Sequence, residues 1–316
     1  MTEPMPDFLN RDRPPVPDLV VPQGVQPFHL DGRPVRGRLI RLGPLAHALL
    51  ARHDYPPAIT RLVGQALALT AGLASALKYR GSFSVHAKGD GAVSMLVSDC
   101  TDDGQLRGHA GLRAEMLAEL LSVEPDPPAG ALLGSGYIAF TADQGPDMDR
   151  YQGIVALEGG TLAEMTHHYF ASSEQLQAQL RLACARTPDG WRASALILER
   201  VASDGGINET PAADDDEAWA TALALASTLT DAELLDDRLE ATHLLHLLFS
   251  TEGLVLDRAR ALSYGCRCSR AKLAAVLGGF PDDDLDEMAD IAGDITMTCE
   301  FCNHDFVFPR AEVRRG

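Results

Sequence analysis

The stretch PAITRLVGQALALTAGLASALKYRGSFSVHAKGDGAVSMLV, residues 57–97, places a helical pattern directly before a hairpin pattern and decides the fold class. In its first half, large apolar residues recur about one helical turn apart, and Gly81 stands where the helix should end. Apolar residues then alternate with others at 83–87, a Gly-Asp-Gly turn follows at 89–91, and the alternation resumes at 93–97. The sequence therefore predicts a long core helix followed by two antiparallel strands.

A second hairpin is predicted farther along the chain. QLQAQLRLACAR at 175–186 alternates strictly between polar and apolar residues, and a Pro-Asp-Gly turn leads into the return strand WRASALILERV at 191–201. Helices and antiparallel strands in one stretch predict an α+β core domain at 26–205. The Pro-rich residues 1–25 before it are expected to form a disordered arm.

The composition changes after this core. Between residues 204 and 240 there are eleven acidic residues and one basic residue, a balance of −10. Thr230 and Glu233 have the spacing of a capping box, and the apolar residues of HLLHLLF at 243–249 fall on one helical stripe. We predict an acidic helical linker at 206–260 whose order depends on the elements around it.

Charge and composition narrow the classes of partner. The net charge of −18 disfavours nucleic acid, whose binders need a basic surface. No apolar run approaches the length of about 18 residues that spans a bilayer, so no membrane association is expected. The first residues lack the features of a secretory signal, and we expect a cytoplasmic protein. In that reducing compartment, close cysteine pairs are more often metal ligands or redox centres than structural disulfides.

Four of the six cysteines form two close pairs. Cys266 and Cys268 make a C-x-C motif, and Cys299 and Cys302 make a C-x-x-C motif thirty residues later. Two such pairs supply the four soft ligands of a closed tetrahedral zinc site, with an iron–sulfur cluster as the second choice. We therefore predict a small domain at 261–316 that binds one Zn²⁺ per chain. Four sulfur ligands leave no position for a catalytic water.

Two roles for this zinc remain open on the residues alone. The ion could simply hold together a unit too small to build a sufficient core. It could instead belong to a switch, because oxidants attack thiolates and each thiol has a partner one or two residues away for a disulfide. Loss of zinc, which contributes about 10–16 kcal/mol in such sites, should unfold the unit.

The remaining cysteines and histidines receive structural interpretations. Cys100 and Cys184 lie in strand patterns and are expected to be buried core thiols. His243 and His246 are expected to pack or to lie at the surface of a Leu-rich helix, and His304 is not needed as a ligand beside four cysteines. No nucleotide-binding or hydrolase motif is present, so the sequence predicts a protein that is not an enzyme.

The chain also resembles a known family, the bacterial 33-kDa redox-activated heat-shock holdase chaperones, also called 33-kDa chaperonins. The resemblance rests on the two cysteine pairs and on stretches of the core, in the family's order from about residue 27 to 310. These stretches are VRGRLIRL, LKYRGSFSVHAKGDG, LRGHAGL, YQGIVAL and YFASSEQL. The chain departs from the family in its long N-terminal arm and in a Gly/Asp-rich insertion around SDGGINETPAADDD.

The resemblance implies a function for the cysteine pairs. Reduced Cys266, Cys268, Cys299 and Cys302 would bind one zinc, and this form would be inactive. Oxidation would join Cys266 to Cys268 and Cys299 to Cys302, release zinc, unfold the C-terminal unit and destabilise the linker. The exposed apolar surface would then hold unfolding client proteins without ATP, and the active form would dimerise.

Two other functions use the same cysteines. A zinc-ribbon nucleic-acid binder would share the four ligands, but residues 261–316 hold six basic residues against ten acidic ones. A thiol oxidoreductase would use Cys299 and Cys302 alone, without metal. Salt-dependent nucleic-acid binding would support the first, and repeated reduction of insulin disulfides by zinc-free protein would support the second.

Overall fold

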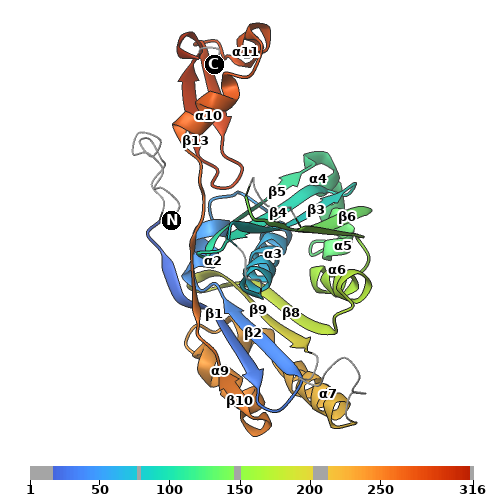
Figure 1. Cartoon of the computed structure of the whole chain (residues 1–316). Helices are drawn as coiled ribbons and strands as arrows, with labels where there is room; N and C mark the ends of the chain where they lie inside the picture. The colour runs from blue at the N-terminus through green and yellow to red at the C-terminus, as the bar shows by residue number, and fades with distance from the viewer. Residues whose placement is uncertain (1–16, 77–79, 146–150, 202–212, 314–316) are drawn as a thin grey trace. The chain divides into compact units, whose positions relative to one another are not determined.

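The chain divides into two compact units, drawn in the computed structural model of Figure 1. The large unit is Leu19–Gly265, and the small unit contains, among the described residues, 17–18 and 266–313. The structure describes residues 17–76, 80–145, 151–201 and 213–313. Together they confirm the predicted α+β fold class.

One mixed sheet organises the large unit. Its strands are β1 (Val20–Leu30), β2 (Val35–Arg41), β3 (Ser82–Gly89), β4 (Val93–Thr101), β5 (Gln105–Leu112), β6 (Gly136–Asp143), β7 (Tyr151–Ala156), β8 (Ala178–Thr187), β9 (Gly190–Arg200), β10 (Leu254–Leu256) and β11 (Arg260–Tyr264). Their order is β7-β6-β3-β4-β5-β11-β1-β2-β9-β8, and β10 also pairs with β1. Both predicted hairpins, β3–β4 and β8–β9, are present. Antiparallel pairs thus build two halves of the sheet, which β11 joins.

The helices of the large unit lie around this sheet (Figure 1). They are α2 (Pro44–Leu50), α3 (Pro57–Ala76), α4 (Ala114–Val123), α5 (Ala129–Leu133), α6 (Leu162–Tyr169), α7 (Ala213–Ser227), α8 (Asp231–Leu235) and α9 (Ala241–Phe249), with short helical turns at Phe170–Glu174 and Ser250–Glu252. α3 is the predicted core helix, and it contacts strands of both halves of the sheet. Gly81 has a φ of 125°, a backbone conformation that favours glycine at the predicted stop.

Burial explains the apolar character of α3. By length and composition this helix could cross a membrane, but 83% of its most apolar window is buried inside the structure. Gly72 of α3 lies so close to Ile197 that an added Cβ would stand 2.6 Å from the isoleucine Cδ1. The helix therefore serves as the packed centre of the large unit.

The acidic segment after the core packs on the sheet. Side chains of α7, α8 and α9 form one apolar cluster with residues of β1, β2, β8 and β9. Leu196 and Leu198 of β9 contribute to this cluster, whereas Ile197 between them lies against α3. β9 is thus buried on both faces, which its sequence alternation alone did not indicate.

Three boundaries differ from the predicted ones. β1 begins at Val20, so residues 20–25 are strand rather than part of a disordered arm, because they pair with β2 and β11. The large unit includes the acidic segment and ends at Gly265, later than the predicted boundary at residue 260, because β11 pairs inside the sheet. Residues 203–212 of the Gly/Asp-rich insertion SDGGINETPAADDD and residues 1–16 lie outside the described residues, whereas its last four residues begin α7.

The small unit contains a two-stranded sheet and two short helices. These are β12 (Asp294–Thr298), β13 (Asp305–Pro309), α10 (Arg270–Leu277) and α11 (Asp282–Met288), with a helical turn at Arg310–Glu312. Apart from cysteines, its large buried apolar side chains among the described residues are Leu277, Leu285, Ile295, Phe306 and Phe308. So small a core makes this unit dependent on another source of stability.

Candidate metal centre

The first cysteine pair lies in the loop between β11 and α10. Gly265 ends the sheet part of the chain, because its N–H donates to the carbonyl of Leu106 over 2.8 Å. Cys266 and Cys268 follow, and Ser269 begins α10 by accepting a 3.3 Å hydrogen bond from the N–H of Lys272. The C-x-C motif therefore follows the end of a strand and precedes the cap of a helix.

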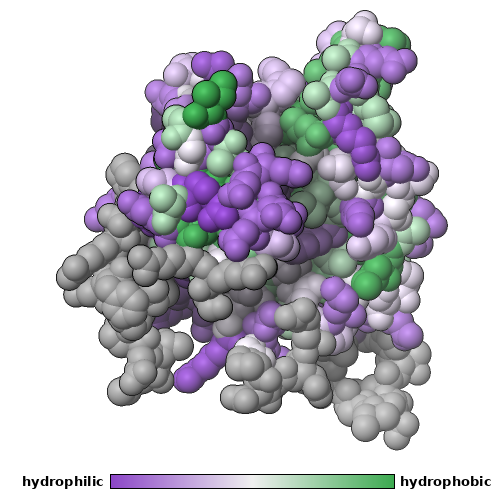
Figure 2. All heavy atoms as spheres, turned by 90° about the horizontal axis from the view of Figure 1, so that it is seen from above, coloured by the Kyte–Doolittle hydropathy of each residue, from purple (hydrophilic) through white to green (hydrophobic). Residues whose placement is uncertain are grey.

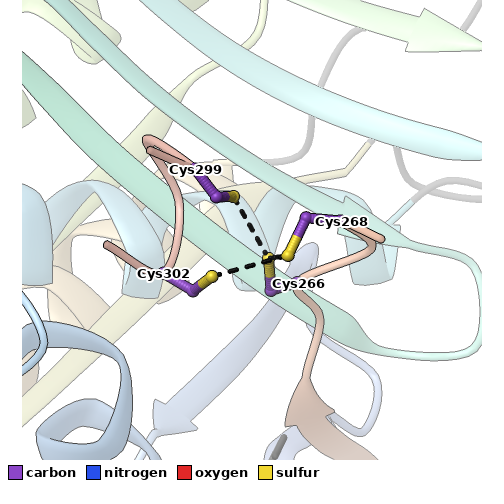
Figure 3. Close-up of side chains that lie close together, drawn as sticks. All are labelled: Cys266, Cys268, Cys299 and Cys302. Atoms are coloured by element: carbon purple, nitrogen blue, oxygen red, sulfur yellow. Dashed lines mark hydrogen bonds between the residues drawn. The ribbon is translucent and has the colours of Figure 1, made fainter. Parts of the chain in front are cut away.

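The second pair lies in the turn of the β12–β13 hairpin. The N–H of Cys299 donates to the carbonyl of His304 over 2.9 Å, and the N–H of Asn303 donates to the carbonyl of Cys299 over 2.7 Å. Asn303 has a φ of 52°, in the left-handed region that asparagine tolerates better than most residues. This tight turn holds Cys299 and Cys302 with their sulfurs toward the first pair (Figure 3).

The four sulfurs have the separations of a tetrahedral metal site. Cys266 Sγ lies 3.4 Å from Cys268 Sγ and 3.7 Å from Cys299 Sγ, and Cys268 Sγ lies 3.5 Å from Cys302 Sγ. All four lie within 4.8 Å of one another. A tetrahedron with Zn–S bonds of about 2.3 Å would separate its sulfurs by about 3.8 Å. The donor set and its geometry therefore fit one zinc ion.

The thiols influence one another's ionisation. Hydrogen bonds from Cys266 and Cys302 hold the pKa of Cys299 well below its usual range, and the backbone N–H groups of Phe301 and Cys302 assist. The contacts with Cys266 and Cys299 raise the pKa of Cys302, while burial and Cys266 raise the pKa of Cys268 to about 12. One thiolate thus forms readily, and a divalent cation would be needed to hold all four sulfurs as thiolates.

Comparison with known proteins places this site in a family. The family model for Hsp33 protein matches residues 23–309. The chain belongs to the Hsp33 family. A 33 kDa chaperonin from Caulobacter vibrioides is 38% identical over 283 residues, which cover 88% of this chain and 92% of the relative. A 33 kDa chaperonin from Pseudomonas aeruginosa is 35% identical over 289 residues, which cover 91% and 92%.

A solved structure supports the Hsp33 fold. The crystal structure of the 33 kDa chaperonin from Thermotoga maritima matches this chain with a TM-score of 0.72, covering 92% of this chain and 96% of that one. The sequence identity is 20%, so this likeness concerns the fold alone.

The other predicted residues lie outside the cluster. Within the part of this Hsp33 chain that the structure describes, the four cysteines form the one group of Cys, His, Asp or Glu side chains that could hold a metal ion. The His304 ring packs edge-on against Phe306, with centroids 4.8 Å apart. Cys100 and Cys184 are buried in the large unit, and burial raises the pKa of Cys184 to about 12. Both core-thiol predictions are confirmed.

A set of arginines on the sheet holds the acidic segment, and no sequence pattern had indicated this role. Arg41 donates to the carbonyls of Glu233, Asp236 and Leu239. Three further ion pairs join sheet strands to the segment, namely Arg181–Asp231 at 2.8 Å, Arg200–Asp216 at 2.6 Å and Arg192–Asp237. The excess of acidic residues in the linker was the available signal, because acidic side chains in a compact chain repel one another unless basic side chains lie nearby.

Proposed function

We propose that this protein is a redox-regulated, ATP-independent holdase chaperone. In the reduced form, Cys266, Cys268, Cys299 and Cys302 hold one Zn²⁺, and this form is inactive as a chaperone. The observation that supports this best is the closed four-sulfur cluster in a chain whose curated relatives are named 33 kDa chaperonins. Zinc bound there stabilises the small unit and leaves no open position for hydrolytic chemistry.

Oxidation is the proposed activating step. Two thiolates give up two electrons to an oxidant such as hydrogen peroxide, which takes up two protons and becomes two molecules of water, and a sulfur–sulfur bond forms. We propose the pairs Cys266–Cys268 and Cys299–Cys302. The sulfur distances are similar within the first pair and between the pairs. The pairing is therefore supported by the close spacing in sequence and by the family resemblance.

Loss of the metal should unfold the small unit. Its five large buried apolar residues can contribute only a small part of its stability. Zinc binding in sites of this kind contributes about 10–16 kcal/mol. We propose residues 261–316 as the redox-switch domain, 26–205 as the chaperone core and 206–260 as the linker between them. The linker acts as a separate functional part even though it packs on the sheet.

The client surface is proposed to be apolar area that the resting form keeps buried. On the face shown in Figure 2, hydrophilic residues predominate and hydrophobic ones form separate patches. By contrast, Phe28, Leu39 and Leu198 lie fully buried where the acidic segment covers the sheet. Release of that segment would expose a continuous patch of the kind that unfolded chains bind.

The remaining functional proposals follow from charge and family. The partners are unfolding client proteins, and the oxidised form is proposed to be a homodimer. The net charge of −18 disfavours binding to nucleic acid. We propose no membrane partner. The proposed location is the cytoplasm, where reduced thiols can hold zinc until oxidative stress. In this scheme the protein binds clients and catalyses no reaction.

One pair of measurements tests the proposal. Light scattering of heat-denatured citrate synthase is followed with protein pretreated either with peroxide at raised temperature or with reductant and zinc. Only the oxidised protein should suppress aggregation. Native mass spectrometry on the same samples should show one zinc in the reduced form and two disulfides without zinc in the oxidised form. Equal suppression by both forms would mean that zinc only holds the small unit together, and suppression by neither would refute the chaperone function.

A further inference from the structure

β11 is the only link between the two halves of the large sheet in the strand order of the described residues. It pairs in parallel with β5 through Ser263↔Gln105 and Tyr264↔Leu106. On its other side it pairs antiparallel with β1, where Ser263 lies opposite Val20. If β11 left, β1 and β5 would each present an unpaired edge, and such edges are templates for another extended chain.

The paired register of β11 is short. The strand has five residues, and its pairing with β1 is interrupted by an irregularity between Val21 and Val25. The N–H of Ser263 donates to the carbonyl of Gly104 over 2.9 Å. A cavity of about 890 Å³ borders the strand and is lined in part by Arg260 and Leu262. A short strand with an interrupted register has few hydrogen bonds to hold it, and such segments open more easily than long continuous strands.

The position of β11 in the chain connects it to the metal centre. Only Gly265 separates the strand from Cys266. Gly265 is itself close to the sheet, since a Cβ there would stand 2.6 Å from the backbone of Gln105 and Leu106. Loss of the metal and closure of a disulfide in the C-x-C loop would therefore change the backbone one residue after the strand ends. The strand best placed to respond to oxidation is therefore β11.

The place that β11 occupies has the properties of a peptide-binding slot. Leu262 and Tyr264 are 2% and 7% exposed, whereas Arg260 and Ala261, the first two residues of β11, are exposed. Leu262 lies over Gly24 of β1, where a Cβ would stand only 2.7 Å from the leucine Cγ. The guanidinium of Arg52 lies 5.1 Å from the Tyr264 ring centroid. The slot thus accepts backbone hydrogen bonds and two large side chains two residues apart.

We propose that oxidation vacates this slot and that an extended segment of an unfolding client replaces β11 between β1 and β5. This proposal rests on the holdase function proposed above and identifies one surface that such a function would use. Backbone pairing supplies affinity with little sequence preference, and alternate apolar side chains of the client fill the space that Leu262 and Tyr264 vacate. Segments with apolar residues at i and i+2 come from strands of proteins that are losing their fold. The slot therefore suits many clients.

The sheet also has ends at β7 and β8, and these differ from the proposed slot. Tyr151 and Ile154 on β7 are exposed in the reduced form. Binding to β7 would therefore need no oxidation. Redox dependence and the location of the bound segment separate the two sites.

A photoreactive peptide tests the proposal on the full-length protein. The probe has the sequence of residues 258–265, RARALSYG, with a benzophenone amino acid at the position of Ala261. It should cross-link to β1 or β5 in the oxidised protein and not in the reduced, zinc-loaded protein. A control peptide with proline at the position of Ser263 lacks one N–H donor and should cross-link about tenfold less. Equal cross-linking in both redox states, or cross-links confined to β7 and β8, would overturn the proposal.

A variant tests whether β11 itself competes for the slot. Leu262→Ala removes the buried side chain, so the reduced variant should exchange the Ser263 and Gly265 amides faster and should take up the probe without oxidation. Val255→Ala, in β10 and 39% exposed, is the matched control and should behave like the parent protein. Failure of Leu262→Ala to take up more probe than Val255→Ala would contradict the proposal.

Light scattering on the same preparations separates this inference from the holdase function. Oxidised protein that protects citrate synthase but takes up no probe would refute the slot and leave the holdase function standing. Oxidised protein that protects nothing would refute both.

Discussion

Arg41, at the end of β2, is the arginine that holds the acidic segment most extensively. Its guanidinium donates to the carbonyls of Glu233 over 2.7 Å, Asp236 over 2.9 Å and Leu239. The side chain is buried, which lowers the pKa of Arg41, while the carboxylates of Asp237 and Asp236 raise it. These contacts connect the sheet to α8 and to the loop that follows it.

Replacing this residue, Arg41→Ala, should loosen the segment without touching the zinc site. Hydrogen bonds from a charged donor contribute about 1.5–3 kcal/mol each. Removal of the guanidinium also removes the cost of burying it, so we expect a net loss of about 2–4 kcal/mol. That corresponds to local opening of residues 231–239 that is about 30- to 1000-fold more frequent.

Hydrogen exchange of the reduced, zinc-loaded protein measures this opening. The amides of Leu234 and Leu239, which donate to Thr230 and Asp236, should exchange faster in Arg41→Ala. Arg238→Ala is the matched control, because the Arg238 side chain is 91% exposed and pairs with Asp236 in the same loop. Exchange in Arg41→Ala within about twofold of the Arg238→Ala control would refute the reasoning, since such a ratio lies below 1 kcal/mol.

Three further predictions concern other parts of the molecule. Cys268→Ser should weaken zinc binding strongly in a competition titration with a chelator, whereas Cys184→Ser should not, and equal zinc affinity of the two variants would contradict the ligand assignment. Cys184 should stay unmodified when iodoacetamide is added to folded protein at pH 7, because burial raises the pKa of its thiol to about 12, and rapid labelling would contradict that. Burial alone would raise the pKa of Glu199, but Arg38 and Arg36 lower it below the usual range. Its stabilising effect is therefore present at neutral pH and is lost as pH falls through the folded-state pKa. Glu199→Gln should reduce the free energy of unfolding of the large unit at pH 7 by about 3 kcal/mol in urea titration, and this difference should shrink in acid. A constant difference from pH 7 to 3 would exclude this ion pair as the cause.

The parts of the fold that the sequence predicted are those built from neighbouring residues. The core helix and both hairpins follow from apolar spacing and turn residues within a single stretch. The cysteine cluster was predictable for the same reason. Each pair is held by a local turn or loop, and four thiols of one chain have few other ways to satisfy a metal.

The parts that escaped prediction depend on residues far apart in the sequence. β11 is short, and its partners in β5 and β1 lie more than 150 residues away, so no local pattern marks it as a central strand. The contacts of Arg41 with α8 and the loop after it span 192 to 198 residues. Burial of β9 on both faces likewise became visible only when the acidic segment was placed on the sheet. In each case tertiary packing decided the outcome.

The acidic segment and β11 are held to the sheet differently, and this difference predicts the order in which they open. Unfolding of the small unit breaks none of the contacts between α7–α9 and the sheet, because these lie inside Leu19–Gly265. The acidic segment keeps its apolar cluster and its arginine contacts. The pairs of β11 also lie inside this unit, but its register is short and only Gly265 separates the strand from Cys266. Oxidation alone should therefore open β11 first, and the acidic segment should follow only when heat or a further perturbation overcomes its own docking. A protein built in this way would need two stresses together before it exposed its full apolar surface.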